Sequence, residues 1–166
     1  MFKTGIGYDI HRLAPGRKLF LGGVEIPHDM GLDGHSDADV VLHAICDALL
    51  GALGEGDIVE HFPNTDKKYH NIASLKLLET VYCLVSKADY VIENIDTVIL
   101  AEEPKLKAYK TPMKARIAKT LKLDESCVNI KATTTESLGT IGRKEGIAAY
   151  ATVLLRKRSK KKHHAI

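Results

Sequence analysis

The feature that most constrains this chain is an acidic residue and a histidine that alternate in an extended segment near the N-terminus. Asp9 and His11 flank Ile10, and in a β-strand residues two apart point to the same face. A carboxylate and an imidazole would therefore lie side by side, with Ile10 turned the other way. The pair favours a strand over residues 2–10 and supplies two of the three protein ligands that a catalytic metal site commonly uses.

The third ligand of such a site is offered by a predicted helix. Residues 38–53 form an apolar run in which Asp39, His43 and Asp47 recur at intervals of four. At that spacing the three side chains would line one face of the helix. A histidine with carboxylates on its own face suits a metal ligand whose second ring nitrogen is held by an acceptor. His43 is therefore the expected third ligand.

The same residues also fit ordinary structural roles. Asp9 could cap a turn, His11 could lie on the surface, and His43 could be a hydrogen-bonded histidine of the helix. An isolated Asp-x-His pair is more often of this kind, and it is the acidic stripe around His43 that favours a metal site.

The remaining patterns predict an α+β domain. We expect strands over residues 2–10, 90–100, 128–133 and 146–155, two short extended pieces within residues 18–27, a loop over residues 56–66, and helices over residues 38–53, 72–88 and 112–122. Ser36 or Asp37 would cap the first helix and Asn71 the second. Long helices among few strands favour a single mixed β-sheet with helices packed on one face, in a ferredoxin-like arrangement. The other face would stay partly apolar and be covered by another subunit.

The distribution of charge argues against a nucleic-acid or membrane partner. The formal net charge is +3, but residues 156–162 hold six of the 24 basic residues and no acidic one. Without them 18 basic residues face 21 acidic ones, and a short basic terminus is more often a solvated end. No apolar run approaches the length of a transmembrane helix. We expect residues 1–155 to form a single catalytic domain and residues 156–166 a disordered basic tail.

The three cysteines indicate a reducing compartment. Cys46, Cys83 and Cys127 lie far apart among apolar residues, which predicts buried, reduced thiols rather than a disulfide framework or a cysteine-based zinc site. The N-terminus lacks the apolar region of a signal peptide. The expected location is cytoplasmic, as in bacteria, and a plastid location would require that a transit peptide was removed.

A second chemical stretch follows the strand predicted over residues 128–133. Thr133, Thr134 and Thr135 would gather hydroxyl and backbone N–H groups, and Arg143 offers a planar fork suited to phosphate. The order of residues is not that of a P-loop. The stretch is typical of a phosphate cradle, although three threonines at the end of a strand also fit β-propensity alone.

Taken together, the ordered motifs resemble the 2-C-methyl-D-erythritol 2,4-cyclodiphosphate synthase family over residues 4–155. The resemblance rests on Gly-Tyr-Asp-Ile-His-Arg at 7–12, Gly-His-Ser-Asp-Ala-Asp-Val-Val-Leu-His-Ala at 34–44, Asp-Ala-Leu-Leu-Gly-Ala at 47–52, Gly-Asp-Ile at 56–58, Phe-Pro-Asn-Thr-Asp at 62–66, Pro-Lys-Leu at 104–106 and Lys-Ala-Thr-Thr-Thr-Glu at 131–136. The chain departs from the family at Asn64, where an Asp is frequent, at Thr140-Ile141, where many members have Phe-Thr, and in the basic tail.

The resemblance implies a reaction in the non-mevalonate isoprenoid pathway. The substrate would be 4-diphosphocytidyl-2-C-methyl-D-erythritol 2-phosphate. An oxygen of its 2-phosphate would attack the β-phosphorus, and CMP would leave, as in a phosphorus–oxygen lyase. The nucleophile is already ionised, so catalysis would consist of positioning and charge neutralisation.

The resemblance also implies roles for individual residues. Asp9, His11 and His43 would hold one zinc ion per subunit with an open fourth position, and Glu136 would reach a Mg²⁺ or Mn²⁺ ion bridging the diphosphate. His35 and Thr134 would act as catalytic donors. The methylerythritol end would contact Ser36, Asp57, Ile58, Phe62, Pro63, Asn64, Thr65 and Asp66. The nucleotide would contact Ala101, Glu102, Glu103, Pro104, Lys105, Leu106, Ala132, Thr133, Thr134, Thr135 and Arg143.

The implied assembly is a homotrimer with active sites shared between subunits. One chain would supply the zinc ligands and the next the cytidine pocket. Apolar residues of the last strand would help to cover the sheet at the threefold centre, namely Ile147, Ala149, Ala151, Val153 and Leu155.

Two other classes of protein fit the residues. A zinc phosphohydrolase would use the same three ligands with a metal-bound water and release inorganic phosphate. A non-enzymatic nucleotide-binding module would hold a structural zinc. Structural zinc normally takes four protein ligands, often Cys, whereas this chain offers three clustered ligands without Cys.

Overall fold

The computed structural model describes residues 1–63 and 72–159. The main sheet has the strand order β4-β1-β7-β5-β6. Its strands are β1 (Phe2–Pro15), β4 (Met30–Leu32), β5 (Tyr90–Leu100), β6 (Val128–Thr133) and β7 (Gly146–Lys157). β7 is antiparallel to both β1 and β5, whereas β5 and β6 are parallel. A separate hairpin pairs β2 (Leu19–Leu21) with β3 (Val24–Ile26).

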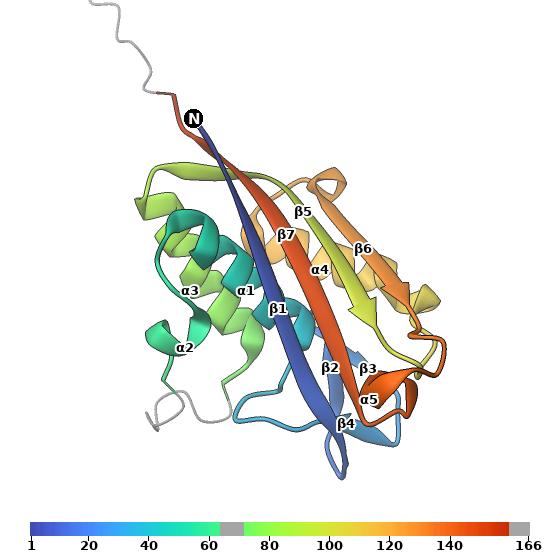
Figure 1. The fold of residues 1–166 in the computed structure, drawn as a ribbon. Helices are drawn as coiled ribbons and strands as arrows, with labels where there is room; N and C mark the ends of the chain where they lie inside the picture. Colours follow the sequence, from blue (N-terminus) through green and yellow to red (C-terminus); the bar gives the residue numbers. More distant parts are fainter. Residues whose placement is uncertain (64–71, 160–166) are drawn as a thin grey trace, which may run out of the picture.

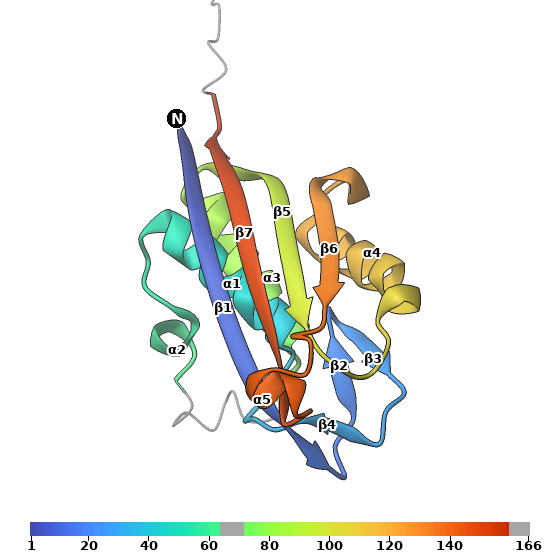
Figure 2. The same cartoon turned by 45° about the vertical axis from the view of Figure 1, so that its right-hand side comes forward.

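Three long helices lie against one face of this sheet (Figures 1 and 2). They are α1 (Val40–Leu53), α3 (Ser74–Lys87) and α4 (Lys110–Leu121). The short elements are α2 (Ile58–His61), α5 (Gly139–Gly142) and the 3₁₀ turns Lys107–Tyr109 and Glu125–Cys127. The core lies between the sheet and these helices, where the apolar side chains of α1 are buried from Val40 to Ala52.

The mixed sheet and its one-sided helical layer confirm the predicted α+β class. The prediction of a ferredoxin-like arrangement is wrong, because the helices and strands follow one another in a different order. Such folds run β-α-β-β-α-β, whereas the main elements of this chain run β1-α1-α3-β5-α4-β6-β7, with β4 added at the sheet edge. Two helices therefore precede the second long strand, and the last strand inserts between β1 and β5.

Several boundaries differ from the predicted ones. β1 extends to Pro15, the short strand β4 was not predicted, and the loop expected over residues 56–66 contains the single turn α2. β7 continues through Lys157, two residues past the expected end of the folded domain. The predicted cap Asn71 lies outside the described residues, and α3 begins at Ser74.

Helix α1 is capped by Asp39, and neither Ser36 nor Asp37 has this role. The Asp39 carboxylate accepts from the backbone N–H groups of Val41 and Leu42, both at 3.1 Å. It also accepts from Gly22 at 2.9 Å and Gly23 at 2.7 Å in the β2–β3 turn. A fully buried carboxylate requires such donors, so one side chain fixes the start of α1 to the hairpin.

Helix α1 lies unusually close to β1 because two glycines of the strand face it. A Cβ atom added at Gly5 or Gly7 would lie far inside van der Waals contact with the carbonyl oxygens of Ala48 and Ala44, respectively. Backbone therefore meets backbone at this crossing. Asp9 and His11 continue the same face of β1 and so point toward the helix.

The helix-free face of the sheet carries exposed apolar side chains. Phe2, Ile6, Tyr8 and Ile10 of β1 and Tyr150 of β7 are all at least 41% exposed. Tyr8 and Tyr150 pair across the strands with ring centroids 4.6 Å apart. This is the partly apolar face that the sequence predicted.

The residues of β7 expected on that face are on the other one. Ile147, Ala149, Ala151, Val153 and Leu155 are buried, at most 3% exposed, on the helix-covered side. Because successive residues of a strand alternate between faces, the open side of β7 is carried by Tyr150, Thr152 and Leu154 instead.

The cysteines are also less uniform than predicted. Cys46 is buried in α1, but Cys83 is exposed and Cys127 is half-buried. No helix in residues 1–63 or 72–159 has the length and apolar character to cross a membrane.

The glycine contact yields a stability prediction. Gly7→Ala should lower the free energy of unfolding by about 3 kcal/mol or more, because a methyl group cannot enter a backbone-to-backbone contact without moving α1. Gly51→Ala is the matched control. Gly51 lies in α1 with only the Ile6 carbonyl oxygen near, at 3.9 Å, so its replacement should stabilise by about 0.5–1 kcal/mol through helix propensity. Urea unfolding of both variants measures the difference, and equal stabilities would contradict the close contact.

Candidate metal centre

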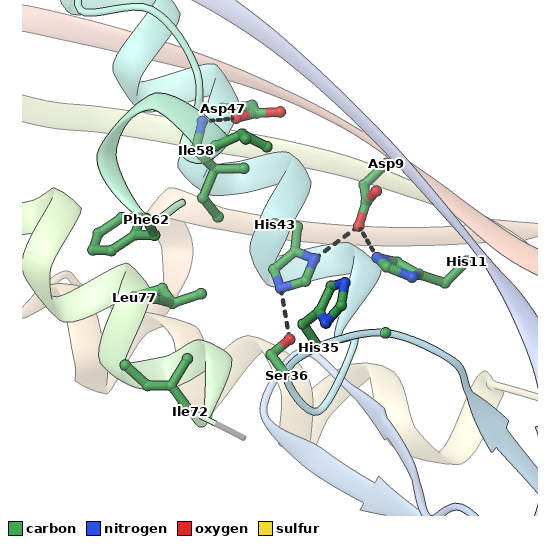
Figure 3. A pocket seen from close by; sticks show the side chains of 12 residues that line it. Asp9, His11, His35, Ser36, His43, Asp47, Ile58, Phe62, Ile72 and Leu77 are labelled. Carbon is green, nitrogen blue, oxygen red and sulfur yellow. Dashed lines mark hydrogen bonds and ion pairs between the residues drawn. The ribbon is translucent and has the colours of Figure 1, made fainter. Parts of the chain in front are cut away.

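Three side chains converge at the contact between β1 and α1 (Figure 3). Asp9 Oδ2 lies 3.1 Å from His11 Nε2 and 2.8 Å from His43 Nδ1. One ligand atom from each residue lies within 4.8 Å of the others. Among the described residues this is the one group of three or more His, Cys, Asp or Glu side chains with that geometry. The predicted ligand triad is thus brought together.

The position of His11 is fixed by the edge strand β4. β4 pairs with β1 from Leu13 to Pro15, which places Asp33 beside His11. The ring donates from Nδ1–H to the Asp33 carbonyl oxygen at 2.6 Å, because a carbonyl can only accept. The other nitrogen, Nε2, is then unprotonated in the neutral ring and faces Asp9. Gly34 leaves room for this contact, since a Cβ there would lie 3.0 Å from His11 Cε1.

The far nitrogen of His43 is held by hydroxyl groups. His43 Nε2 lies 2.9 Å from Ser74 Oγ and 3.3 Å from Ser36 Oγ. Ser74 Oγ in turn donates to the Asp37 carboxylate. The predicted acidic stripe of α1 does not provide this partner. Asp39 caps the helix, and Asp47 accepts from the backbone N–H of Ile58 at 2.8 Å.

The electrostatics favour an ionised Asp9. Burial raises the pKa of this carboxyl, but hydrogen bonds with His11 and His43 outweigh burial and hold the pKa well below its usual range. Burial lowers the pKa of His11, and the hydrogen bond and charge of Asp9 outweigh that effect and raise it. A negative oxygen and two imidazole nitrogens therefore share one small volume.

This donor set fits a divalent cation. Both imidazoles have their outer nitrogens committed to partners in the protein, which directs the inner lone pairs at the same carboxylate oxygen. Protonated rings hydrogen-bond to Asp9 through these inner nitrogens. In neutral rings the inner lone pairs would repel the carboxylate, and a shared cation would satisfy all three groups. Two imidazoles and a carboxylate with room for another ligand are typical of catalytic zinc sites.

The three ligands form part of the wall of a cavity of about 270 Å³. Its lining is Asp9, His11, Gly34, His35, Ser36, His43, Asp47, Ile58, Val59, Phe62, Ile72 and Leu77. The predicted residues His35, Ser36, Ile58 and Phe62 are therefore at the cavity. One side of it is polar and contains the metal ligands. The other side is apolar and comes from α2, from Phe62 just after α2, from Ile72 just before α3, and from α3 itself (Figure 3).

Two of the remaining residues predicted for the methylerythritol end are described but do not line this cavity. Asp57 caps α2 by accepting from the N–H groups of Val59 and Glu60 at 2.9 and 3.1 Å. It thereby fixes the start of α2, which carries Ile58, and is not part of the cavity lining. Pro63 is not part of the lining either. Asn64, Thr65 and Asp66 lie outside the described residues.

The residues predicted for the nucleotide form a separate cluster where β5 and β6 end (Figure 2). Glu102 Oε1 accepts from the Thr135 N–H at 2.9 Å and from the Ser137 N–H at 3.3 Å. The Thr134 hydroxyl donates to Glu136 at 2.8 Å. Within the described chain, none of residues 101–106 and 132–136 lines the cavity at Asp9.

The predicted phosphate ligand Arg143 is exposed and forms an ion pair with Glu145 at 2.7 Å. Arg143 and Thr134 are also absent from the cavity lining, and Glu136 is not in the metal-ligand group. In one chain, the structure thus brings the metal ligands together with His35, Ser36, Ile58 and Phe62 but leaves the nucleotide residues apart.

The sequence did not identify the three residues that orient the histidines, and it did not identify two residues of the apolar wall. The Asp33 carbonyl and Ser74 left no sequence signal, because a backbone group and a lone serine have no periodic pattern. Asp37 was predicted only as a possible cap of the first helix. Ile72 and Leu77 fell only within the helix predicted over residues 72–88. Their place at the cavity follows from the packing of α3 on α1.

Comparison with known proteins gives a consistent result. The model of the YgbB family matches residues 2–156. The chain is 55% identical over 157 residues to the 2-C-methyl-D-erythritol 2,4-cyclodiphosphate synthase of Bacillus subtilis, covering 95% of this chain and 99% of that protein. It is 58% identical over 149 residues to the protein of the same name from Agathobacter rectalis, covering 90% and 84%.

Solved structures agree in fold. The bifunctional IspDF of Campylobacter jejuni matches with a TM-score of 0.92 and 47% identity, covering 96% of this chain. The chain spans 43% of the length of that bifunctional protein. The IspF of Plasmodium falciparum, in a CDP complex, matches with a TM-score of 0.85 and 35% identity, covering 95% of this chain and 97% of the other.

The geometry predicts that Zn²⁺ binding requires His43. His43→Ala should lose stoichiometric Zn²⁺ while the chain stays folded, because a catalytic site of three ligands is not the main source of folding energy. His35→Ala is the control, since His35 lines the same cavity but is outside the three-ligand group. Metal analysis after gel filtration measures both. Full Zn²⁺ content in His43→Ala would show that the ligand assignment is wrong.

Proposed function

The chain belongs to the YgbB family, and from this premise we propose that it is a 2-C-methyl-D-erythritol 2,4-cyclodiphosphate synthase, a lyase of the non-mevalonate isoprenoid pathway. The observation that carries the proposal is a three-ligand metal centre in the wall of a cavity. The relatives that bear this name are matched over most of their own length. The expected location is the cytoplasm.

The reaction is an intramolecular phosphoryl transfer. In 4-diphosphocytidyl-2-C-methyl-D-erythritol 2-phosphate, an oxygen of the 2-phosphate forms a bond to the β-phosphorus. The bond from that phosphorus to the bridging oxygen breaks, and CMP leaves with this oxygen. No proton must be removed from the nucleophile, because the phosphate is already ionised. The protein therefore has to position two phosphates and neutralise their charge.

Asp9, His11 and His43 would hold the first cation, and their donor set favours Zn²⁺. Glu136 would contact a second, Mg²⁺ or Mn²⁺, at the diphosphate. When bound, these cations supply positive charge that stabilises the phosphoryl oxygens in the transition state.

The side chains around the metal ligands have separate tasks. His35 and Ser36 offer hydrogen-bond donors toward the cavity, and the hydroxyl of Thr134 would donate from the nucleotide side. Asp57 and residues 62–66 would bind the methylerythritol hydroxyls. The apolar wall of Ile58, Val59, Phe62, Ile72 and Leu77 would exclude water, which would otherwise hydrolyse the diphosphate.

The complete site would form between neighbouring chains of a homotrimer. Two observations support this. The nucleotide residues are apart from the cavity of their own chain, and the open sheet face presents Ile6, Tyr8 and Ile10 to solvent. Each site would combine the metal ligands of one chain with residues 101–106, 132–136 and Arg143 of the next. The CDP complex of the Plasmodium falciparum relative supports a cytidine nucleotide as the occupant.

Residues 1–155 would act as one catalytic domain, with the basic residues 156–166 outside the chemistry. Neither nucleic acid nor a membrane is required as a partner. Two rival functions remain, a metal phosphohydrolase and a nucleotide-binding module with a structural metal. Residues 1–63 and 72–159 offer only three clustered ligands beside the cavity, which argues against the second, because a structural zinc is enclosed by four protein ligands.

The function is tested with the diphosphocytidyl substrate. Incubation with Zn²⁺ and Mg²⁺ should yield CMP and a cyclic diphosphate in equal amounts. Chromatography and ³¹P NMR measure the two products. His43→Ala should yield neither. Inorganic phosphate in place of CMP would identify a phosphohydrolase, and binding without turnover would identify a binding module.

Shared sites are tested by complementation. His43→Ala and Glu136→Ala, each inactive, are unfolded together in equal amounts and refolded. Random mixing of the two chains leaves about one quarter of the interfaces with both halves intact, so activity should return to about that fraction of the wild type. Mixed trimers that stay inactive, while each variant alone is folded and trimeric, would contradict sharing.

A further inference from the structure

We propose that Ser74 and Asp37 are positioning residues that fix the tautomer and ring orientation of His43 and thereby set how tightly the metal centre holds its cation. The inference rests on the proposed metal centre. It assigns a role to a hydrogen-bond chain that runs from the N-terminus of α3 to the metal ligand on α1.

The chain of contacts begins at Asp37. Its Oδ1 accepts from the Ser74 hydroxyl, and its Oδ2 accepts from the Ser74 backbone N–H at 3.1 Å. Oδ1 also accepts from the Asp39 N–H at 3.4 Å. Ser74 is fully buried, so water does not compete for its hydroxyl. The Ser74 oxygen then lies 2.9 Å from His43 Nε2.

A count of protons gives the direction of each bond. A carboxylate can only accept, and a serine hydroxyl has a single proton to donate. That proton goes to Asp37, so toward His43 the oxygen presents a lone pair. His43 Nε2 must therefore carry a hydrogen and donate it. In the neutral ring this leaves Nδ1 unprotonated and directed at Asp9, 2.8 Å away, which is the form that binds a metal.

Asp37 also has a structural role, which the test must separate from positioning. Helix α3 has Ala73 at its N-cap position and no side-chain cap of its own. Asp37 supplies the missing acceptor through the Ser74 N–H. Removal of the Ser74 hydroxyl leaves that backbone bond intact, so Ser74→Ala interrupts the chain to His43 without removing the acceptor at the helix end.

Ser36 provides the matched control. Its oxygen lies 3.3 Å from the same nitrogen of His43 and already accepts from the Ala38 N–H at 3.0 Å. The Ser36 hydroxyl thus lies farther from His43 Nε2 than the Ser74 hydroxyl does, and it does not share the hydrogen bond of Ser74 to a carboxylate. Replacement of Ser36 by Ala should leave the tautomer of His43 unchanged.

The experiment measures Zn²⁺ affinity of the full-length protein at fixed pH by competition with a chromophoric chelator. Ser74→Ala should weaken binding by about 10- to 100-fold, the range found when the partner of a metal-bound histidine is lost. Ser36→Ala should stay within about 3-fold of the wild type. The visible absorption spectrum of the Co²⁺-loaded protein should change in Ser74→Ala, because the ring is no longer held, and not in Ser36→Ala.

A second variant reverses the direction of these hydrogen bonds without changing the shape of the side chain at position 37. In Asp37→Asn the amide can donate to the Ser74 oxygen, which frees the hydroxyl proton for His43 Nε2 and favours the tautomer with hydrogen on Nδ1. Zn²⁺ affinity should fall as in Ser74→Ala, even if the latter folds poorly. Wild-type affinity in a folded Ser74→Ala or Asp37→Asn would overturn the proposal. Wild-type affinity in His43→Ala would instead overturn the metal centre itself and the function built on it.

Discussion

The contact of α1 with β1 determines the rest of the structure. Gly5 and Gly7 remove the side chains that would hold helix and strand apart, so the carbonyl groups of Ala44 and Ala48 lie directly over the strand. Asp9 and His11 follow on the same face of β1, and His43 precedes Ala44 on the helix. A wider helix–strand spacing, as in ordinary α/β packing, would separate these groups. The candidate metal centre is therefore a consequence of backbone contact, with His43 Nδ1 only 2.8 Å from Asp9.

The centre also connects four parts of the chain. The Asp33 carbonyl after β4 orients His11, and Ser74 at the start of α3 orients His43. Each of these outer contacts leaves an inner nitrogen free to bind a cation, so the protein arranges the ligands before the cation arrives. The same segments provide cavity residues, because Gly34 and Ser36 follow Asp33, and Leu77 lies in the first turn of α3. Ligand orientation and cavity shape thus depend on the same packing.

The sequence was sufficient for features that have a period. Alternation on β1 and the four-residue spacing in the helix identified Asp9, His11 and His43, and the helical pattern located α1 and α3. It failed where a role depends on distant partners. Asp39 is held at the N-cap of α1 by the backbone N–H groups of Gly22 and Gly23, which donate to its carboxylate from the distant β2–β3 turn. Ser74 belongs to no periodic pattern. The run from Ile147 to Ala151 has no polar alternation, so only the pairing of β7 with β1 determines which of its side chains face the helices.

The division of the proposed site between two segments of one chain has a physical consequence. The nucleotide residues are held by bonds of their own, from Thr135 to Glu102 and from Thr134 to Glu136, and the metal ligands by theirs. Each half is ordered without the other, so assembly would need to supply only their relative position. The surface available for this is the open sheet face, where Ile6 and Tyr8 alternate with the glycines that contact α1. One strand would thus carry the metal ligands on one face and the subunit contact on the other, so a shift of β1 would disturb both at once.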